Sequence, residues 1–217
     1  MPTRLFRFLF PLPTAEGSYY YPAIYTALSS GVRQAELLGL RWRDLDPDIM
    51  LSTSVSRVLY KRRGVCEFRE RKTSHSRRYV SMTPKLATLL REYRQERKVL
   101  YRERGKELAL DDLVFSNIEG KPLNPSSLSR DFARVVKKAG LENVRFQDLR
   151  HTFASLMLLR GAKPKVISEA LGHASVAFTM DVYSHIIESM QSDAMALLDE
   201  VLPFGKNGVF GKINANF

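Results

Sequence analysis

The chain has 217 residues, and 44% of them are hydrophobic, which is enough for a domain with a buried core and too much for wholesale disorder. Lys and Arg number 34 against 23 Asp and Glu, a formal net charge of +11 that favours a polyanionic partner, most often nucleic acid. The single cysteine, Cys66, excludes an intramolecular disulfide and a cysteine-built zinc site. No apolar run is long enough to span a membrane, and we expect a cytoplasmic protein.

Apolar residues recur at helical spacing over most of the chain, except between residues 49 and 82, where the pattern changes to alternation. The sequence therefore predicts a mainly α fold with a small three-stranded antiparallel β-sheet. We expect strands near 49–60, 65–71 and 78–82 and a further short strand at 113–116. We expect helices near 20–31, 33–40, 84–105, 124–140, 147–160, 164–172 and 190–201, and one that starts after Ser175 and carries Tyr183.

The chain divides into an irregular leader at 1–16, one domain at 17–202 and a mobile tail at 203–217. The leader is rich in Phe and Leu, but Arg7 and the prolines interrupt its apolar run, which argues against a signal peptide. The predicted sheet is basic. A solvated face is the simple explanation of such a charge run, and an edge that faces DNA is the alternative.

Three separated blocks carry polar side chains that can hold and attack a phosphate group. The first reads SGVRQAELLGLRWRDLD at 30–46, and the second reads KTSHSRR at 72–78. The third begins with RFQDLRHTFA at 145–154, continues with LGH at 171–173 and ends with DVYSH at 181–185. Each motif is weak alone, and the three in this order are a specific signal.

In these blocks the chain resembles the catalytic domain of the tyrosine recombinases, also called phage-type integrases. The resemblance covers roughly residues 17–201 and implies a mainly helical fold with a small antiparallel sheet. It also implies site-specific cleavage and rejoining of double-stranded DNA without a metal or another cofactor. By the same resemblance Tyr183 attacks the scissile phosphorus and forms a 3′-phosphotyrosyl bond.

The resemblance also assigns roles to the other site residues. Arg33 and Arg150 bind the non-bridging phosphate oxygens through planar, permanently charged guanidinium groups. His173 donates a further hydrogen bond to the phosphate, and Lys72 protonates the departing 5′ oxygen as general acid. Glu36 is expected to orient its neighbours.

His151 is expected to be a structural member of the third block. A zinc site built from His151 with His75, His173 and His185 has neither close ligand spacing nor an acidic partner.

The chain departs from the family pattern at Gln147. Family members usually have a histidine there, three residues before Arg150. Glutamine can hydrogen-bond a phosphate oxygen but cannot exchange a proton near neutral pH. Because free tyrosine has a pKa near 10, we expect the loss of this base to slow attack by Tyr183 rather than abolish it.

A second departure lies at the N-terminus, where the residues before the matching region do not resemble the helical DNA-clamping domain of the family. We therefore expect weak, salt-sensitive DNA binding. We also expect self-association on DNA, possible accessory DNA-bending proteins, and a C-terminal segment from about Ser189 that packs on its own domain or on a neighbouring protomer. Two alternative functions stay open: a DNA-binding remnant with little catalysis, and DNA relaxation like that of type IB topoisomerases.

Overall fold

The computed structural model describes residues 15–45, 52–55, 57–62, 65–70, 78–184 and 195. Seven α-helices and one 3₁₀ helix are assigned in this part of the chain: α3 (Tyr21–Ser30), α4 (Gln34–Leu37), η1 (Trp42–Asp44), α5 (Pro84–Arg102), α6 (Pro125–Lys138), α7 (Asp148–Leu159), α8 (Pro164–Leu171) and α9 (Val176–Val182). The strands are β1 (Ser52–Val55), β2 (Arg57–Arg62), β3 (Val65–Glu70) and β4 (Arg78–Ser81). The predicted fold class, mainly helical with a small antiparallel sheet, is confirmed.

Local capping explains where the helices begin. Thr83, Asn124 and Ser175 each accept a hydrogen bond from a backbone N–H in the first turn of the following helix, at 3.2, 2.9 and 3.2 Å. In α5, α6 and α8 a proline occupies the first turn, where its missing N–H costs nothing. The predicted starts of these helices therefore agree with the structure to within a residue or two.

The strands pair differently from the expected three-stranded order. β1 pairs with β4 and β2 pairs with β3, both antiparallel. The first predicted strand thus comprises β1 and β2, and the third pairs with β1 rather than with β3. Along the chain, residues 71–77 separate β3 from β4, whereas residue 56 alone separates β1 from β2. Lys72 belongs to that longer segment and lies outside the described residues.

One further predicted strand agrees with the structure only in part, and the predicted elements at the two ends of the chain lie mostly outside the described residues. The predicted strand at 113–116 is reduced to isolated bridges, from Leu113 to Arg41 and from Ser116 to Pro122. The predicted final helix lies outside the described residues except for Met195, and the leader before residue 15 and the tail lie outside them altogether. None of the helices in the described ranges is long and apolar enough to cross a membrane.

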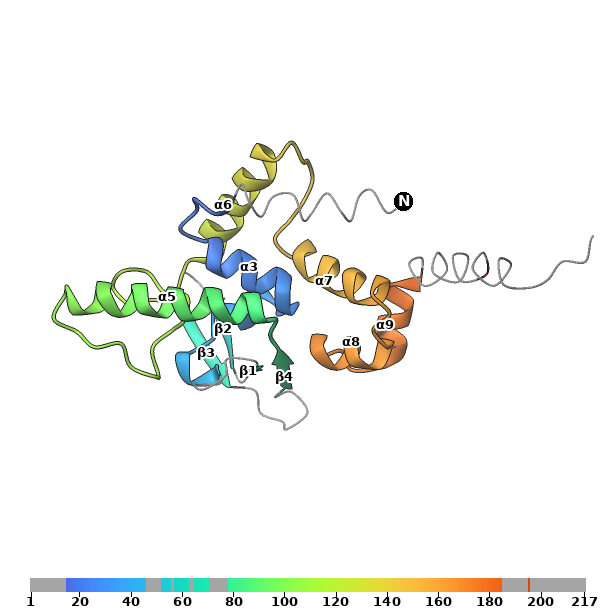
Figure 1. Cartoon of the computed structure of the whole chain (residues 1–217), viewed down its shortest axis with the longest axis horizontal. Helices are drawn as coiled ribbons and strands as arrows, with labels where there is room; N and C mark the ends of the chain where they lie inside the picture. The colour runs from blue at the N-terminus through green and yellow to red at the C-terminus, as the bar shows by residue number, and fades with distance from the viewer. Residues whose placement is uncertain are drawn as a thin grey trace, which may run out of the picture.

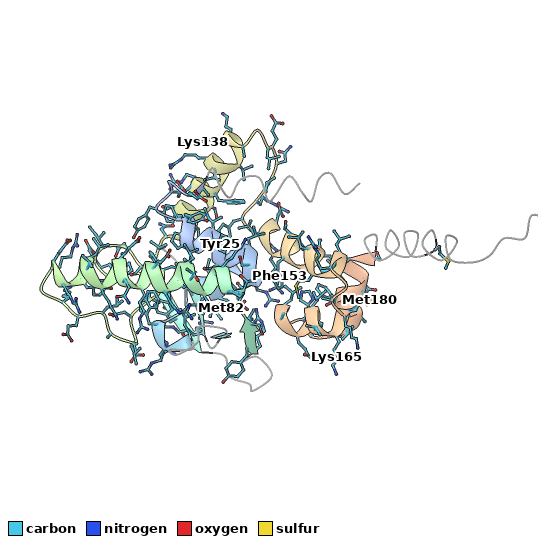
Figure 2. The ribbon with its side chains drawn as sticks, in the orientation of Figure 1. Tyr25, Met82, Lys138, Phe153, Lys165 and Met180 are labelled. Atoms are coloured by element: carbon cyan, nitrogen blue, oxygen red, sulfur yellow. The ribbon has the colours of Figure 1, made fainter. Side chains whose placement is uncertain are left out.

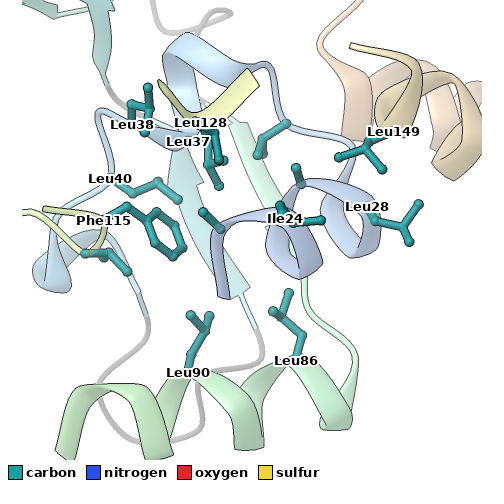
Figure 3. Packing of buried hydrophobic residues seen from close by; sticks show 14 of the residues in the cluster. Ile24, Leu28, Leu37, Leu38, Leu40, Leu86, Leu90, Phe115, Leu128 and Leu149 are labelled. Carbon is teal, nitrogen blue, oxygen red and sulfur yellow. The ribbon is translucent and has the colours of Figure 1, made fainter. Parts of the chain in front are cut away.

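The main core forms around α3, which packs on α5 and α7. Figure 3 shows Leu86 and Leu90 of α5 pointing toward Ile24 of α3, with Leu37 and Phe115 in the same cluster. A second, smaller cluster comprises Ala154, Leu158, Ile167, Leu171 and Tyr183. Figure 1 shows the helices of this second cluster, α7, α8 and α9, grouped together at one end of the fold.

Gly31 joins the two parts of the fold. It ends α3 with a left-handed φ of 64°. A Cβ at this position would collide with the Phe153 ring and would lie 2.9 Å from a methyl group of Leu171. Figure 2 labels Phe153 where α7 meets the end of α3. Only glycine allows α7 and α8 to approach α3 this closely.

We predict that Gly31→Ala lowers the free energy of unfolding by about 3 kcal/mol, because backbone strain at positive φ adds to an overpacked contact. Gly161→Ala is the matched control, since Gly161 has a φ of 80° and open space around its Cβ position. Gly161→Ala should lower the free energy of unfolding by only about 1 kcal/mol, from the backbone strain alone. Urea unfolding measures both variants, and equal losses would contradict the packing explanation.

Candidate active site

Arg33 lies in the connection between α3 and α4 and is held there by Glu36. The backbone N–H of Arg33 donates to Oε2 of Glu36 at 2.9 Å, and its Nη1 donates to Oε1 at 3.0 Å. The Arg33 side chain is 43% exposed, whereas that of Glu36 is fully buried. The buried carboxylate therefore holds the backbone and side chain of Arg33 in place, and part of the guanidinium stays accessible to solvent.

Arg78, at the start of β4, binds the same carboxylate from inside the protein. Its Nη2 and Nη1 donate to Oε2 and Oε1 of Glu36 at 2.8 and 3.2 Å, a two-point contact. Its Nε donates to the carbonyl oxygen of Ala170 in α8 at 2.7 Å. One buried guanidinium thus ties α4, β4 and α8 together.

The charge of Glu36 depends on these arginines. Burial alone would raise the pKa of the Glu36 carboxyl, but hydrogen bonds and attraction from Arg78, followed by those from Arg33, bring it down to about 2. Glu36 therefore stays ionised throughout the physiological range.

Arg150 lies in the first turn of α7 and also joins separate elements. Its Nη1 donates to the carbonyl oxygen of Gly31, and its Nη2 donates to that of Leu171, both at 2.7 Å. Burial, followed by repulsion from Arg33, lowers the pKa of Arg150 to about 10, so it remains charged at neutral pH. A guanidinium has five N–H donors, so these two bonds leave others for a ligand.

Arg33 and Arg150 meet at one pocket of about 210 Å³. Its wall consists of Val32, Arg33, Gln34, Phe146, Gln147 and Arg150. Two guanidinium groups beside an exposed amide suit an anion with several oxygen atoms. The lining of this pocket could therefore bind an anion such as a phosphate group.

His173 lies next to this pocket, after the left-handed Gly172 that ends α8. A Cβ at Gly172 would lie 2.9 Å from Nη1 of Arg78, so the glycine of the LGH motif makes room for the buried arginine. Nδ1 of His173 lies 2.7 Å from Oγ1 of Thr179, and its ring meets Phe178 edge to face at 4.9 Å between centroids. These contacts fix the orientation of the imidazole ring.

The same surroundings keep His173 neutral. Burial, then repulsion from Arg150 and Arg33, lowers the pKa of His173 to about 4. If Thr179 donates its hydroxyl proton to Nδ1, the ring proton lies on Nε2 and is available to a ligand. Thr179 is buried, so the partner of Nδ1 is shielded from water.

Tyr183 follows the last residue of α9 and is only 3% exposed. Its hydroxyl oxygen lies 3.1 Å from Nδ1 of His151 in α7. Burial raises the pKa of Tyr183, and the positive charge of Arg150 partly offsets this. At neutral pH the phenol is therefore protonated and hydrogen-bonded to an imidazole.

The structure brings most of the predicted site residues close together. Arg33, Gln147 and Arg150 line one pocket, while His173 and Tyr183 lie on the adjoining α8–α9 side. The charge of Arg150 acts on both: it helps to lower the pKa of His173 and offsets part of the rise that burial gives to the pKa of Tyr183. Lys72 and the metal-site candidates His75 and His185 lie outside the described residues.

Two residues that make these contacts, Arg78 and Thr179, were not singled out from the sequence. The contact between His151, which was expected to be structural, and Tyr183 was not predicted either. Arg78 did stand in the second block, next to the motif residues, but nothing local shows which carboxylate it binds.

We predict that Glu36→Gln lowers the free energy of unfolding at pH 7 by roughly 3–5 kcal/mol, because the buried Arg78 loses its counter-charge. The folded-state pKa of Glu36 is lowered, so its stabilising charge is fully present above the ordinary value of 4.5 and disappears as the pH falls toward about 2. The difference in the free energy of unfolding between wild type and Glu36→Gln should therefore become smaller in acid.

Urea unfolding at neutral pH and at about pH 3 measures this gap. Glu142→Gln, which removes an exposed carboxylate, is the control and should change stability little. A gap for Glu36→Gln that stays the same at both pH values would contradict the ionic explanation.

Known recombinases and integrases are similar to this chain in sequence. The tyrosine recombinase XerC-like protein of Caldanaerobacter subterraneus subsp. tengcongensis is 28% identical over 187 residues, which cover 81% of this chain and 48% of the relative. The ICEBs1 integrase of Bacillus subtilis is 31% identical over 183 residues, which cover 84% of this chain and 49% of the relative. The chain thus spans about half the length of these curated relatives.

Solved structures show the same fold. The Tn1549 transposon integrase in complex with circular intermediate DNA superimposes with a TM-score of 0.72 at 24% identity, covering 91% of this chain and 66% of that one. The XerA recombinase superimposes with a TM-score of 0.65 at 25% identity, covering 89% and 64%. The model of the phage integrase family matches residues 11–190, and the chain therefore belongs to the phage integrase family.

Proposed function

We propose that this chain is the catalytic part of a site-specific DNA recombinase that cuts and rejoins strands through a 3′-phosphotyrosyl link at Tyr183. The observation that carries the proposal is the pocket between Arg33 and Arg150, with His173 and the Tyr183 phenol on the adjoining side. A phosphate in the pocket would meet two fixed positive charges, and the nucleophile lies close by.

The residues suit the charge that develops in such a reaction. When an oxygen attacks a phosphodiester, negative charge grows on the non-bridging oxygens of phosphorus. Arg33 and Arg150 would neutralise it, and the neutral imidazole of His173 would add an N–H donor. A donor aimed at developing charge is worth roughly 3–4 kcal/mol of transition-state stabilisation.

The proposed step forms a bond between the Tyr183 oxygen and phosphorus and breaks the bond to the 5′ oxygen of the next nucleotide. Lys72 stays the predicted general acid for that departing oxygen. Attack by the 5′ hydroxyl of a partner strand reverses the step and releases Tyr183. Since the phosphotyrosyl link keeps the phosphodiester energy, the cycle needs no nucleotide cofactor.

Double-stranded DNA is the proposed partner. The solved Tn1549 transposon integrase holds circular intermediate DNA, and the XerH recombinase holds its difH substrate. The net charge of +11 of this chain is consistent with a similar ligand. Self-association on DNA and accessory DNA-bending proteins stay predictions.

The two alternative functions gain nothing from these findings. A remnant that only binds DNA has no need of a tyrosine hydroxyl held against an imidazole. The relatives are recombinases and integrases by name, which favours recombination over topoisomerase-like relaxation.

We predict that the chain forms a covalent adduct with DNA through Tyr183. The probe is a pool of duplex oligonucleotides with a nick inside a randomised segment, so that a short fragment with a 5′ hydroxyl leaves after cleavage and traps the link. Recovered adducts are sequenced to define a single substrate for rate measurements. The expected product is a 3′-phosphotyrosyl adduct, resolved on a denaturing gel.

Tyr183→Phe should abolish the adduct, because phenylalanine has no nucleophilic oxygen. Tyr79→Phe is the matched control, since Tyr79 is 77% exposed on β4 and should be dispensable. An adduct that survives Tyr183→Phe, or no wild-type adduct with any member of the pool, would contradict the proposed function.

A further inference from the structure

His151 makes a contact that its place in the sequence does not explain. Its Nδ1 lies 3.1 Å from the hydroxyl oxygen of Tyr183, and the two ring centroids are 6.1 Å apart. The His151 side chain reaches solvent, whereas Tyr183 is buried. A residue that reaches solvent therefore contacts the hydroxyl of a buried tyrosine.

We propose that His151 is a catalytic residue that accepts the phenolic proton when the Tyr183 oxygen attacks phosphorus and returns it when the strand is resealed. This inference rests on the proposed function. It gives a role in the chemistry to a residue for which the sequence indicates only a structural part.

The helix that carries His151 makes this division of roles possible. Arg150 and His151 are consecutive in α7, so their side chains point about 100° apart around the helix axis. Arg150 faces the pocket and the carbonyls of Gly31 and Leu171, while His151 faces Tyr183. One turn of α7 thus supplies a phosphate ligand and a proton acceptor side by side.

Gln147 cannot take this proton. An amide neither accepts nor releases a proton near neutral pH, whereas an imidazole does both. Gln147 lines the phosphate pocket, and among the hydrogen bonds of the described residues none joins it to Tyr183. His151, four residues after Gln147, is the histidine that contacts the Tyr183 hydroxyl directly.

The phenol needs an acceptor because burial raises the pKa of Tyr183. With the proton of His151 on Nε2, its Nδ1 has a free lone pair that accepts the hydrogen bond from the phenol. As the oxygen–phosphorus bond forms, the proton moves to Nδ1, and the 5′ oxygen leaves with a proton from the general acid. In resealing, the 5′ hydroxyl loses its proton to that acid, and Tyr183 regains its own from Nδ1.

The test compares single-turnover rates of adduct formation on the nicked duplex selected from the randomised pool. His151→Asn keeps a hydrogen-bonding group near the position of Nδ1 but cannot take up a proton. We expect it to slow adduct formation about 100-fold, in the range measured for general bases. Leu159→Asn is the matched control: it places the same residue at another exposed position of α7 and should leave the rate unchanged.

Two further arms separate proton uptake from other roles. Gln147→His added to His151→Asn supplies an imidazole beside the pocket and should recover at least ten-fold of the lost rate. A duplex with sulfur in place of the bridging 5′ oxygen has a leaving group that needs no general acid. The His151→Asn defect should persist on it, because His151 acts on the nucleophile.

The outcomes distinguish the two proposals. If wild type forms the adduct and His151→Asn forms it at the same rate, the role of His151 is overturned and the proposed function stays intact. Rescue of His151→Asn by the sulfur substrate would overturn it too, since His151 would then act on the leaving group. If wild type gives no adduct that depends on Tyr183, both proposals fall, because there is no attacking phenol to assist.

Discussion

A single buried carboxylate, that of Glu36, is the constraint on which the site depends. It accepts hydrogen bonds from Arg33 at the start of α4 and from Arg78 at the start of β4. Because two guanidinium groups surround it, the carboxylate stays charged despite burial, and its charge in turn allows the arginines to lie close together. Through the bond from Arg78 to Ala170, the same network reaches α8 and the histidine that follows it.

Arg150 provides the second link between the same elements. It binds the last turn of α3 through Gly31 and the end of α8 through Leu171. Buried guanidinium groups are costly unless their donors are satisfied, so these carbonyls fix the position of the group before any ligand arrives. The proposed phosphate pocket is therefore largely formed in advance, which would lower the reorganisation needed when charge develops.

The sequence predicted the parts of this structure that depend on local chemistry. Thr83 before Pro84 and Asn124 before Pro125 are cap-and-proline pairs that mark helix starts, so the starts of α5 and α6 could be predicted from neighbouring residues alone. The residues Arg33 and Arg150 could be chosen by their motifs, and the structure places both on one pocket.

The long-range partners could not be predicted from a single sequence. Glu36 and Arg78 are 42 residues apart, and His151 and Tyr183 are 32 apart. A buried carboxylate and an exposed one look alike in the sequence, and so do a structural and a reactive histidine. The prediction of the strand pairing was wrong for a related reason, because the alternation pattern does not say which strand β4 pairs with.

The central claim is that Arg33, Arg150 and His173 converge on one phosphate that faces Tyr183. The most direct measurement is a crystal structure of the Tyr183→Phe variant bound to the nicked duplex selected for adduct formation. We predict one backbone phosphate within hydrogen-bonding distance of Arg33, Arg150 and His173, with residue 183 and His151 on the side opposite the departing 5′ oxygen. A duplex whose phosphates contact only exposed lysines and arginines, with this pocket empty, would contradict the account.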